Sequence, residues 1–432
     1  MRRRSLQQAA LVLPLVLLGC GGQDPPRAAE PDGAYLAYLR QAPELRRVPQ
    51  DSVATGETGA TGDEGRWDRW VYMPWRYRWH IGTDRRGGEF AKAYGINGGV
   101  MDHGLGPLDW LERWNLRFYN DHTAGKGSLY LLPNQLGKDL HNPRAVRPRP
   151  VSPGLARELG ATVASNIALV RRSPLRIAYS LDDEISTGSF VRPIPWRIND
   201  DDQAYERWLS IYYGGSPPEA RVVSRFVGPD EVRGELDGEL AEIDLSPLLD
   251  RMTYNDSVWA NLVGGLVERC NREDPGVPCG FVGGQPPNLW GGYDWAKLAR
   301  KLQFVEAYDL GSAPEIVRSF SPTIPRVSTH FHDERRGPGN DVWLAWHHFA
   351  HGNRGMVAWV EGWFSLDGTP LPWLERFRPT LRELTGIQGK KTVGARWLQD
   401  GVAIYYSHPS IQVSWLLDAQ PHGRTWADRN DD

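Results

Sequence analysis

Residues 175–186 read LRIAYSLDDEIS, an apolar run that ends in three consecutive carboxyl groups. The apolar part, 175–180, has the length and composition of a buried β-strand. A helical pattern at 153–171 with Ser152 in the N-cap position precedes it, and another at 203–213 follows it. A strand between two helices, with polar residues directly after the strand, is typical of a parallel α/β sheet.

The same pattern recurs along the chain from about residue 70. The eight strands that we expect lie within 71–82 and at 98–101, 116–119, 175–180, 279–282, 304–307, 326–329 and 355–360. Helical patterns separate them at 88–94, 108–114, 153–171, 203–213, 257–271, 293–301, 314–320, 341–351 and 372–384. This count predicts a (β/α)₈ TIM barrel of the α/β class, with its active site at the C-terminal strand ends.

The start of the chain has the features of an export signal. A basic segment at 1–4 precedes an apolar segment at 9–18, which is too short to span a bilayer. The sequence Leu17-Leu18-Gly19-Cys20 resembles the lipobox of bacterial lipoproteins. The resemblance implies cleavage after residue 19, lipid on Cys20 and anchoring in the bacterial cell envelope. Gly21 in place of an aspartate favours the outer membrane.

Composition divides the chain further. Residues 20–66 are rich in Gly, Pro and charged residues and are expected to form a flexible tether with one short helix at 32–45. The barrel is expected at 67–390, and 391–432 to begin a C-terminal β-containing segment, with a strand and turn at 402–410. The net charge of −3, without basic runs, does not favour a nucleic-acid partner.

Cysteine and aromatic residues give weaker signals. Cys270 and Cys279 enclose a short polar loop, and in an oxidising compartment they are expected to form a disulfide, with two free thiols as the alternative. The 19 tryptophans and 16 tyrosines suit either sugar stacking or the core. Trp290 and Trp363 lie near expected strand ends and are therefore candidate sugar-binding residues.

Carboxyl groups gather where the expected strands stop. Glycoside cleavage needs two of them, one to protonate the leaving oxygen and one to act as nucleophile or base. The candidates are Asp102, Asp121, Asp183, Glu184, Glu306, Asp309, Asp333 and Glu361. Crowding and partial burial at the end of the fourth strand are expected to raise the pKa of Glu184, as a general acid requires. The acidic run could also be a solvated loop.

Several short motifs, in order, resemble the family 42 β-galactosidase group over roughly residues 70–390. That group ends its fourth strand in an acid/base glutamate, usually after asparagine, and here Glu184 follows Asp183. The similar segments further on are 208–214 (WLSIYYG), 292–297 (GYDWAK) and 346–352 (WHHFAHG) with 355–357 (GMV). The resemblance implies a glycoside hydrolase that cleaves β-linked sugars and uses no cofactor.

The chain departs from that group at the seventh strand. The group's nucleophilic glutamate ends this strand, whereas residues 328–333 here read STHFHD. Asp309, Asp333 or Glu361 could supply the second carboxyl, and Asp309 ranks first because Tyr308 and Glu306 lie beside it in sequence. Asp183 as nucleophile with Asp309 as acid is the alternative, and both retaining and inverting mechanisms stay open.

The remaining polar residues leave other functions open. Asp102, Asp121, Tyr308 and His330 are candidate sugar-binding residues at strand ends. A barrel without the seventh-strand nucleophile could instead bind carbohydrate without cleaving it. His330 and His332 alternate along one strand, so they face the same side, and with Asp333 and His103 they could serve a metal-dependent hydrolase. In the resembled group, the segment at 402–410 opens a second domain, which the chain ending at Asp432 would lack through loss or truncation.

Overall fold

The structure is a computed structural model of the chain. It describes residues 65–75, 77, 81–131, 149–187, 198–215, 245–289, 291–360, 362–365, 368–393, 395 and 404–418. The signal segment, Cys20 and the expected tether up to residue 64 lie outside these ranges, as do Trp290 and Glu361. None of the helices in the described ranges has the length and hydrophobicity that crossing a membrane requires.

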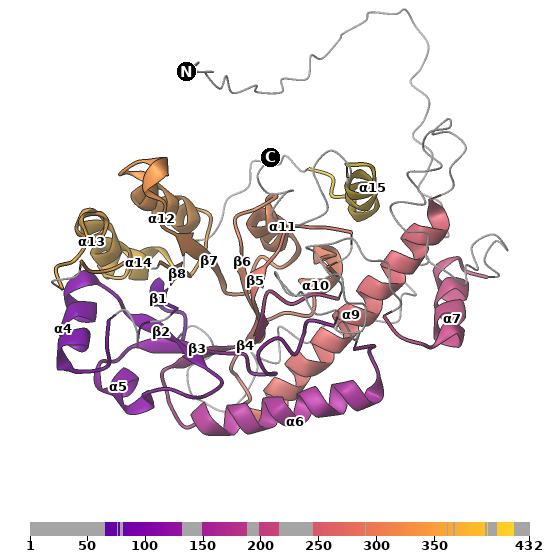
Figure 1. Cartoon of the computed structure of the whole chain (residues 1–432), viewed down its shortest axis with the longest axis horizontal. Helices are drawn as coiled ribbons and strands as arrows, with labels where there is room; N and C mark the ends of the chain where they lie inside the picture. Colours follow the sequence, from indigo (N-terminus) through magenta and orange to yellow (C-terminus); the bar gives the residue numbers. More distant parts are fainter. Residues whose placement is uncertain are drawn as a thin grey trace, which may run out of the picture.

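Eight parallel strands form one nearly closed barrel, with helices around its outside (Figure 1). The strands are β1 (Val71–Pro74), β2 (Gly98–Asp102), β3 (Arg117–Asp121), β4 (Arg176–Asp183), β5 (Cys279–Gly284), β6 (Phe304–Ala307), β7 (Arg326–Phe331) and β8 (Gly355–Trp359). Their order in the sheet is β1-β8-β7-β6-β5-β4-β3-β2. The predicted TIM barrel is confirmed, because each expected strand coincides or overlaps with an observed one.

The side chain of Asn97 joins the first and last strands of this order. Its oxygen accepts a hydrogen bond from the backbone N–H of Tyr72 at 2.9 Å, and its amide donates to the carbonyl of Trp70 at 2.8 Å. A side-chain amide offers the same donor and acceptor as a peptide group. Asn97 therefore connects the start of β2 to β1.

The strands separate two buried apolar layers. The smaller layer contains residues from all eight strands, such as Val71, Tyr119, Phe304, Val327 and Val357, and fills the barrel interior. The larger layer contains the alternate strand residues together with the helices. Because successive strand residues point to opposite faces, this division shows which side chains at a strand end face the interior.

The helices follow the pattern expected from the sequence. They are α4 (Arg85–Tyr94), α5 (Leu108–Arg113), α6 (Pro153–Val170), α7 (Asp202–Tyr212), α9 (Ser246–Glu273), α10 (Trp295–Leu298), α11 (Ala313–Phe320), α12 (Asn340–Ala350), α13 (Pro372–Leu384), α14 (Ile387–Thr392) and α15 (His408–Asp418). The Ser152 hydroxyl accepts from the N–H of Leu155, as the predicted N-cap of α6. Gly95 ends α4 in the left-handed conformation. The long helices α6 and α9 pack against each other.

Two expected elements differ from the structure. Helix α9 begins at Ser246, eleven residues before the expected start at residue 257. The described part of the C-terminal segment, 404–418, contains no strand; its regular structure is α15. The Ser407 hydroxyl accepts from the N–H of Ser410, and Pro409 lies in the first turn, so residues interpreted as a turn after a strand begin a helix instead.

Candidate functional site

Four carboxyl groups meet at the C-terminal end of the barrel, which we call the barrel mouth. Asp121 ends β3, Asp183 ends β4, Glu184 follows it, and Glu306 lies in β6. The negative charges of Asp121, Glu184 and Glu306 all act on Asp183, which shows that the four groups lie close together. Burial, followed by this repulsion, holds the pKa of Asp183 well above its ordinary value.

Glu184 has a constrained backbone at this position. Its φ of 50° is in the left-handed region, which side chains other than glycine rarely occupy. Gly283 at the end of β5 lies directly beside it, because a Cβ on Gly283 would be 2.4 Å from Oδ1 of Asp183 and 2.8 Å from Cγ of Glu184. Strained backbone supported by close packing is typical of functional positions.

The side chain of Glu184 is held by one phenol. Tyr308, which follows β6, donates its hydroxyl to Oε1 of Glu184 at 2.8 Å. Burial raises the pKa of Glu184, and the hydrogen bond from Tyr308 offsets part of this rise. The expectation of a raised pKa therefore agrees with the geometry, with burial rather than the adjacent acids as the main cause.

Both carboxyl oxygens of Glu306 are hydrogen-bonded to neighbouring residues. Its Oε2 accepts the backbone N–H of Gly283 at 2.6 Å, and Oε1 is bonded to the Thr329 hydroxyl of β7. Burial raises the pKa of Glu306 to about 8. A neutral acid at physiological pH, with both oxygens in use, is poorly suited to act as nucleophile or base.

A buried histidine connects three aspartates at the mouth. His122 Nδ1 lies 2.5 Å from Oδ1 of Asp102, and Nε2 lies 3.8 Å from Asp121 and 3.9 Å from Asp182. Burial alone would lower the pKa of His122, but these three carboxyl groups raise it overall. An imidazolium here would offset part of the negative charge of the mouth.

Asp121 and Asp182 differ in how their oxygens are used. Asp182 accepts the N–H groups of Gly127, Leu129 and Asp183 at 2.9–3.1 Å, and burial raises its pKa to about 7. It therefore holds the loop after β3 against the end of β4. In Asp121, Oδ1 accepts the N–H of His122 at 2.8 Å, while the buried Oδ2 has no hydrogen-bond partner among the described residues.

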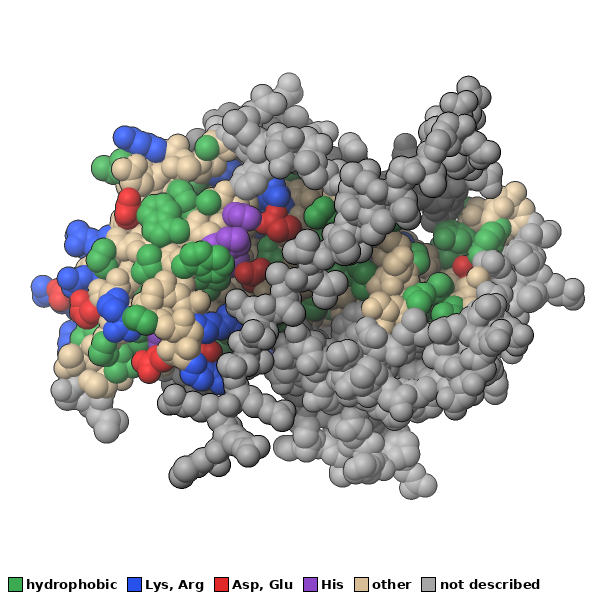
Figure 2. Space-filling view, turned by 90° about the horizontal axis from the view of Figure 1, so that it is seen from above, with side chains coloured by type: hydrophobic (Ala, Val, Ile, Leu, Met, Phe, Trp, Pro, Cys, Tyr) green, Lys and Arg blue, Asp and Glu red, His purple; other side chains and the backbone are tan. Residues whose placement is uncertain are grey.

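Aromatic side chains come from the interior-facing ends of neighbouring strands. The rings of Trp75, after β1, and Trp359, ending β8, are 4.4 Å apart. Phe331, ending β7, packs edge-on against Tyr308 at 5.4 Å, and both Phe331 and Trp359 are exposed. Figure 2 shows a face on which histidine and acidic side chains lie beside exposed hydrophobic ones. Aromatic faces beside carboxyl groups are suited to bind the C–H faces and hydroxyls of sugars.

The structure does not bring Asp309 to Glu184. The Asp309 carboxylate lies 3.9 Å from Nε2 of His348, a buried residue of α12. Because α12 covers the outside of the barrel, Asp309 is directed away from the mouth. Its rank as the first choice for the second carboxyl was based on sequence proximity to Tyr308, and the geometry favours Asp121 instead. Asp333, another candidate for the second carboxyl, also lies outside the group of four carboxyl groups at the mouth. It pairs with the exposed Arg335.

His330 and His332 share one side of β7 as expected, but this is the outer side. His330 is fully buried between β7 and the helices, with Nδ1 2.7 Å from the Tyr72 hydroxyl and Nε2 2.9 Å from Asp341 of α12. His332 also contacts Asp341, at 3.0 Å. Neither Asp333 nor His103 completes this set. We therefore correct the assignment of His330 as a sugar ligand, and these histidines do not form a hydrolytic centre at the mouth.

Within the described residues, four groups have ligand atoms close enough together for a metal ion. They are Asp102 with His103 and His122, Asp309 with His347 and His348, His330 with His332 and Asp341, and Asp256 with Asp294 and His408. The first group is the one at the barrel mouth. In this group, His122 Nδ1 is within hydrogen-bond distance of Asp102 Oδ1, at 2.5 Å.

The remaining expectations concern Trp363 and the two cysteines. Trp363 is 2% exposed and donates its indole N–H to the carbonyl of Val360, so it belongs to the core and not to a sugar-binding surface. The thiols of Cys270 and Cys279 are buried, unbonded and 2.8 Å apart, and their pairing stays a prediction. Neither His122 nor Trp359 was among the predicted site residues, although an aspartate ends both β2 and β3 and a histidine follows each of them.

Comparisons with known proteins support the fold. No protein-family model matches the sequence, and no curated protein sequence matches it. The fold is similar to that of the cold-adapted β-galactosidase from Rahnella sp. R3, with a TM-score of 0.53, 14% identity, and coverage of 81% of this chain and 60% of that one. It is also similar to a catalytic mutant of the family 42 β-galactosidase Gan42B from G. stearothermophilus, with a TM-score of 0.51, 12% identity, and coverage of 83% and 62%.

These values establish a shared architecture. The chain has a (β/α)₈ barrel similar in fold to these two β-galactosidases, and it spans about 60% of their length. Fold similarity at this identity does not transfer an activity, because one barrel architecture supports many reactions. The function must be argued from the residues at the mouth.

Proposed function

We propose that this protein is a glycoside hydrolase whose substrate binds at the barrel mouth, with Glu184 as the general acid. The observation that carries the proposal is the state of Glu184: a buried carboxyl with a raised pKa, held by Tyr308, at the end of the fourth strand. A carboxyl whose pKa is raised holds its proton to a higher pH than an ordinary glutamate, and is therefore better suited to donate it to a leaving oxygen. The sequence resemblance to the family 42 β-galactosidase group implies the same position for the acid.

We propose Asp121 as the second carboxyl. Its Oδ2 is buried at the end of β3 without a hydrogen-bond partner among the described residues, and His122 lies 3.8 Å away as a compensating group. By contrast, burial and neighbouring acids favour the neutral forms of Asp183 and Glu306. Asp121 would then activate the attacking group, while Trp75, Phe331 and Trp359 stack on the sugar.

The substrate class follows from these groups. Aromatic faces beside several carboxyl oxygens suit a neutral oligo- or polysaccharide, and we propose a β-linked one from the resemblance to β-galactosidases.

We also propose that the protein is lipid-anchored. The basic and apolar segments at the start of the chain and the lipobox-like sequence before Cys20 support residues 1–19 as a lipoprotein signal and Cys20 as a lipid anchor in the outer membrane. A lipid-anchored hydrolase would act on glycans at the cell envelope.

One observation favours a second function, the binding of carbohydrate without cleavage. At the end of β7, Thr329 faces the interior and engages Glu306, so in the described residues this strand supplies no carboxyl group to the mouth. A barrel of this kind would retain the aromatic surface and lose the nucleophile.

Release of reducing sugar from a panel of β-linked oligosaccharides tests the proposal. We expect turnover by the full chain, and a large loss of turnover in Glu184→Gln. Glu112→Gln is the matched control, because Glu112 is an exposed residue of α5. Binding of oligosaccharides with no release by the unmodified protein would reject the hydrolase and support the second function.

A further inference from the structure

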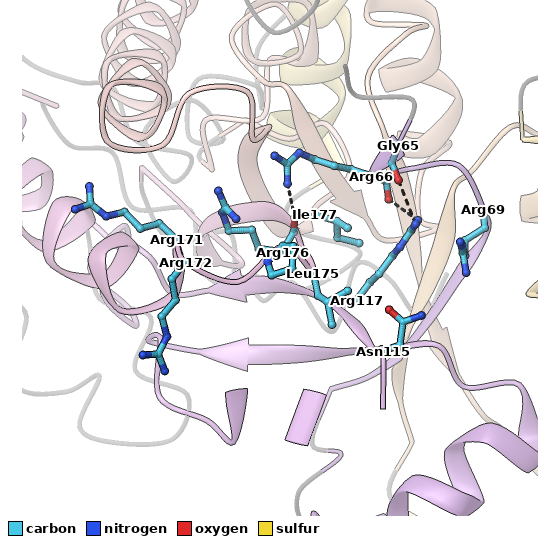
Figure 3. Close-up of a pocket in the computed structure, with 11 residues that line it drawn as sticks. Gly65, Arg66, Arg69, Asn115, Arg117, Arg171, Arg172, Leu175, Arg176 and Ile177 are labelled. Atoms are coloured by element: carbon cyan, nitrogen blue, oxygen red, sulfur yellow. Dashed lines mark hydrogen bonds between the residues drawn. The ribbon is translucent and has the colours of Figure 1, made fainter. Parts of the chain in front are cut away.

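The opposite end of the barrel from the mouth has a cavity lined by six arginines (Figure 3). It has a volume of about 660 Å³. Arg117 and Arg176 begin β3 and β4, and Arg171 and Arg172 follow α6. Arg66 and Arg69 precede β1 in the described chain. Three separate segments of the chain, 66–69, 117 and 171–176, thus bring guanidinium groups to one place.

Two aspartates pair with arginines of this cavity. Asp274 pairs with Arg176 at 2.5 Å, and Asp68 pairs with Arg69 at 3.0 Å and with Arg117 at 2.7 Å. At least three of the six arginines are therefore paired with an aspartate, in a chain whose overall net charge is −3. The concentration of positive charge is local and runs against the overall composition.

The arginines at the rim remain available for a ligand. Arg171 and Arg172 are exposed, and no ion pair engages either of them among the described residues. In Figure 3 they extend from one side of the cavity, with Arg66 and Arg176 at its centre and Arg117 and Arg69 on the other side. The dipole of α6 favours cations at its C-terminal end, such as Arg171 and Arg172, but it does not explain the arginines from the other two segments.

Arginine is suited to one kind of anion in particular. Its planar guanidinium donates two parallel hydrogen bonds to the oxygens of a phosphate or carboxylate group. The inner guanidinium groups are held in place: Arg66 donates to the carbonyl of Arg176 at 3.0 Å, and Arg117 donates to that of Arg66 at 2.6 Å. A fixed inner set with an exposed rim suits a ligand with more than one charged group.

We propose that this arginine cavity binds a ligand carrying phosphate groups, either the headgroups of an anionic membrane lipid or a free phosphorylated molecule. The site is independent of the sugar chemistry at the mouth. Gly65 and Arg66, which precede β1, both line the cavity.

Two arms of one experiment distinguish the sources. The full chain carrying Cys20→Ser, so that no acyl chain contributes, is tested for sedimentation with phosphatidylglycerol–phosphatidylcholine vesicles and with phosphatidylcholine vesicles alone. Calorimetry with inorganic pyrophosphate forms the second arm. Binding to the anionic vesicles alone supports the lipid source, and binding to pyrophosphate supports the free one. Binding in neither arm overturns the proposal.

A charge-matched pair of variants tests the location. Arg171→Gln with Arg172→Gln removes two exposed charges at the cavity, and Arg85→Gln with Arg86→Gln removes two exposed charges from α4. At about fivefold for each arginine near an anionic surface, the first variant should bind roughly 25-fold more weakly, and the second should bind as the parent does. An equal loss in both variants would show general electrostatic attraction and would reject the cavity as the site.

Discussion

Replacing Glu306 with glutamine should change how stability depends on pH. The pKa of Glu306 rises from an ordinary 4.5 to about 8 because the side chain is fully buried. A pKa difference of one corresponds to about 1.4 kcal/mol. Ionising Glu306 in the folded protein therefore costs about 5 kcal/mol more than ionising it in the unfolded chain. Between pH 4.5 and 8 the folded protein keeps this proton and the unfolded chain loses it. The free energy of unfolding contributed by Glu306 therefore falls as the pH rises through this range.

Glutamine has the shape of the neutral acid and cannot ionise. Its oxygen can accept from Gly283, and its amide can donate to the Thr329 hydroxyl. In urea unfolding at a series of pH values, Glu306→Gln should match the unmodified protein near pH 5 and become the more stable of the two by several kcal/mol near pH 8.5. Glu112→Gln, on the exposed side of α5, should follow the unmodified protein throughout. Parallel curves for Glu306→Gln would refute a raised pKa and would return Glu306 to the list of possible bases.

Three other perturbations test separate parts of the structure. Gly283→Ala should destabilise the protein by about 1–3 kcal/mol and disturb the mouth, because Gly283 has a φ of 67° and a Cβ there would overlap Asp183; denaturant unfolding equal to that of the parent would contradict the close approach. Alkylation of the unreduced, denatured protein should label neither Cys270 nor Cys279, whose bond would contribute about 2–3 kcal/mol, whereas labelling of both would exclude the disulfide. Cys20→Ser should release the protein from membrane fractions after a salt wash, and retention after the wash would reject the lipid anchor.

Strand positions could be predicted from the sequence because each strand is a short apolar run followed by polar residues. This pattern follows directly from burial on both faces of a parallel sheet. It located β6 at 304–307 and α13 at 372–384 without error. It failed at 404–418, where a serine and a proline that begin α15 are equally typical of a turn after a strand.

Side-chain direction at the strand ends was harder to predict. Glu306 and Asp309 lie three residues apart, and Glu306 points into the barrel whereas Asp309 points toward His348 of α12, as continued alternation would place them. A shift of one residue reverses the face, and the sequence does not show where a strand stops alternating. His330 shows the same difficulty, since the pairing of His330 with His332 on one side was predictable and the choice of the outer side was not. His122 became visible as a site residue only when β2, β3 and β4 were placed side by side.

The central claim is that Glu184 donates a proton to the leaving oxygen of a glycoside. The most direct measurement compares Glu184→Gln with the unmodified protein on a substrate with a poor leaving group and on an activated aryl glycoside. Because general acid catalysis supplies about 10²–10⁴-fold, Glu184→Gln should lower turnover of the first substrate by that factor and have a much smaller effect on the second. Asp121→Asn should impair both. Near-normal turnover of the poor substrate by Glu184→Gln would contradict the claim and remove Glu184 from the mechanism.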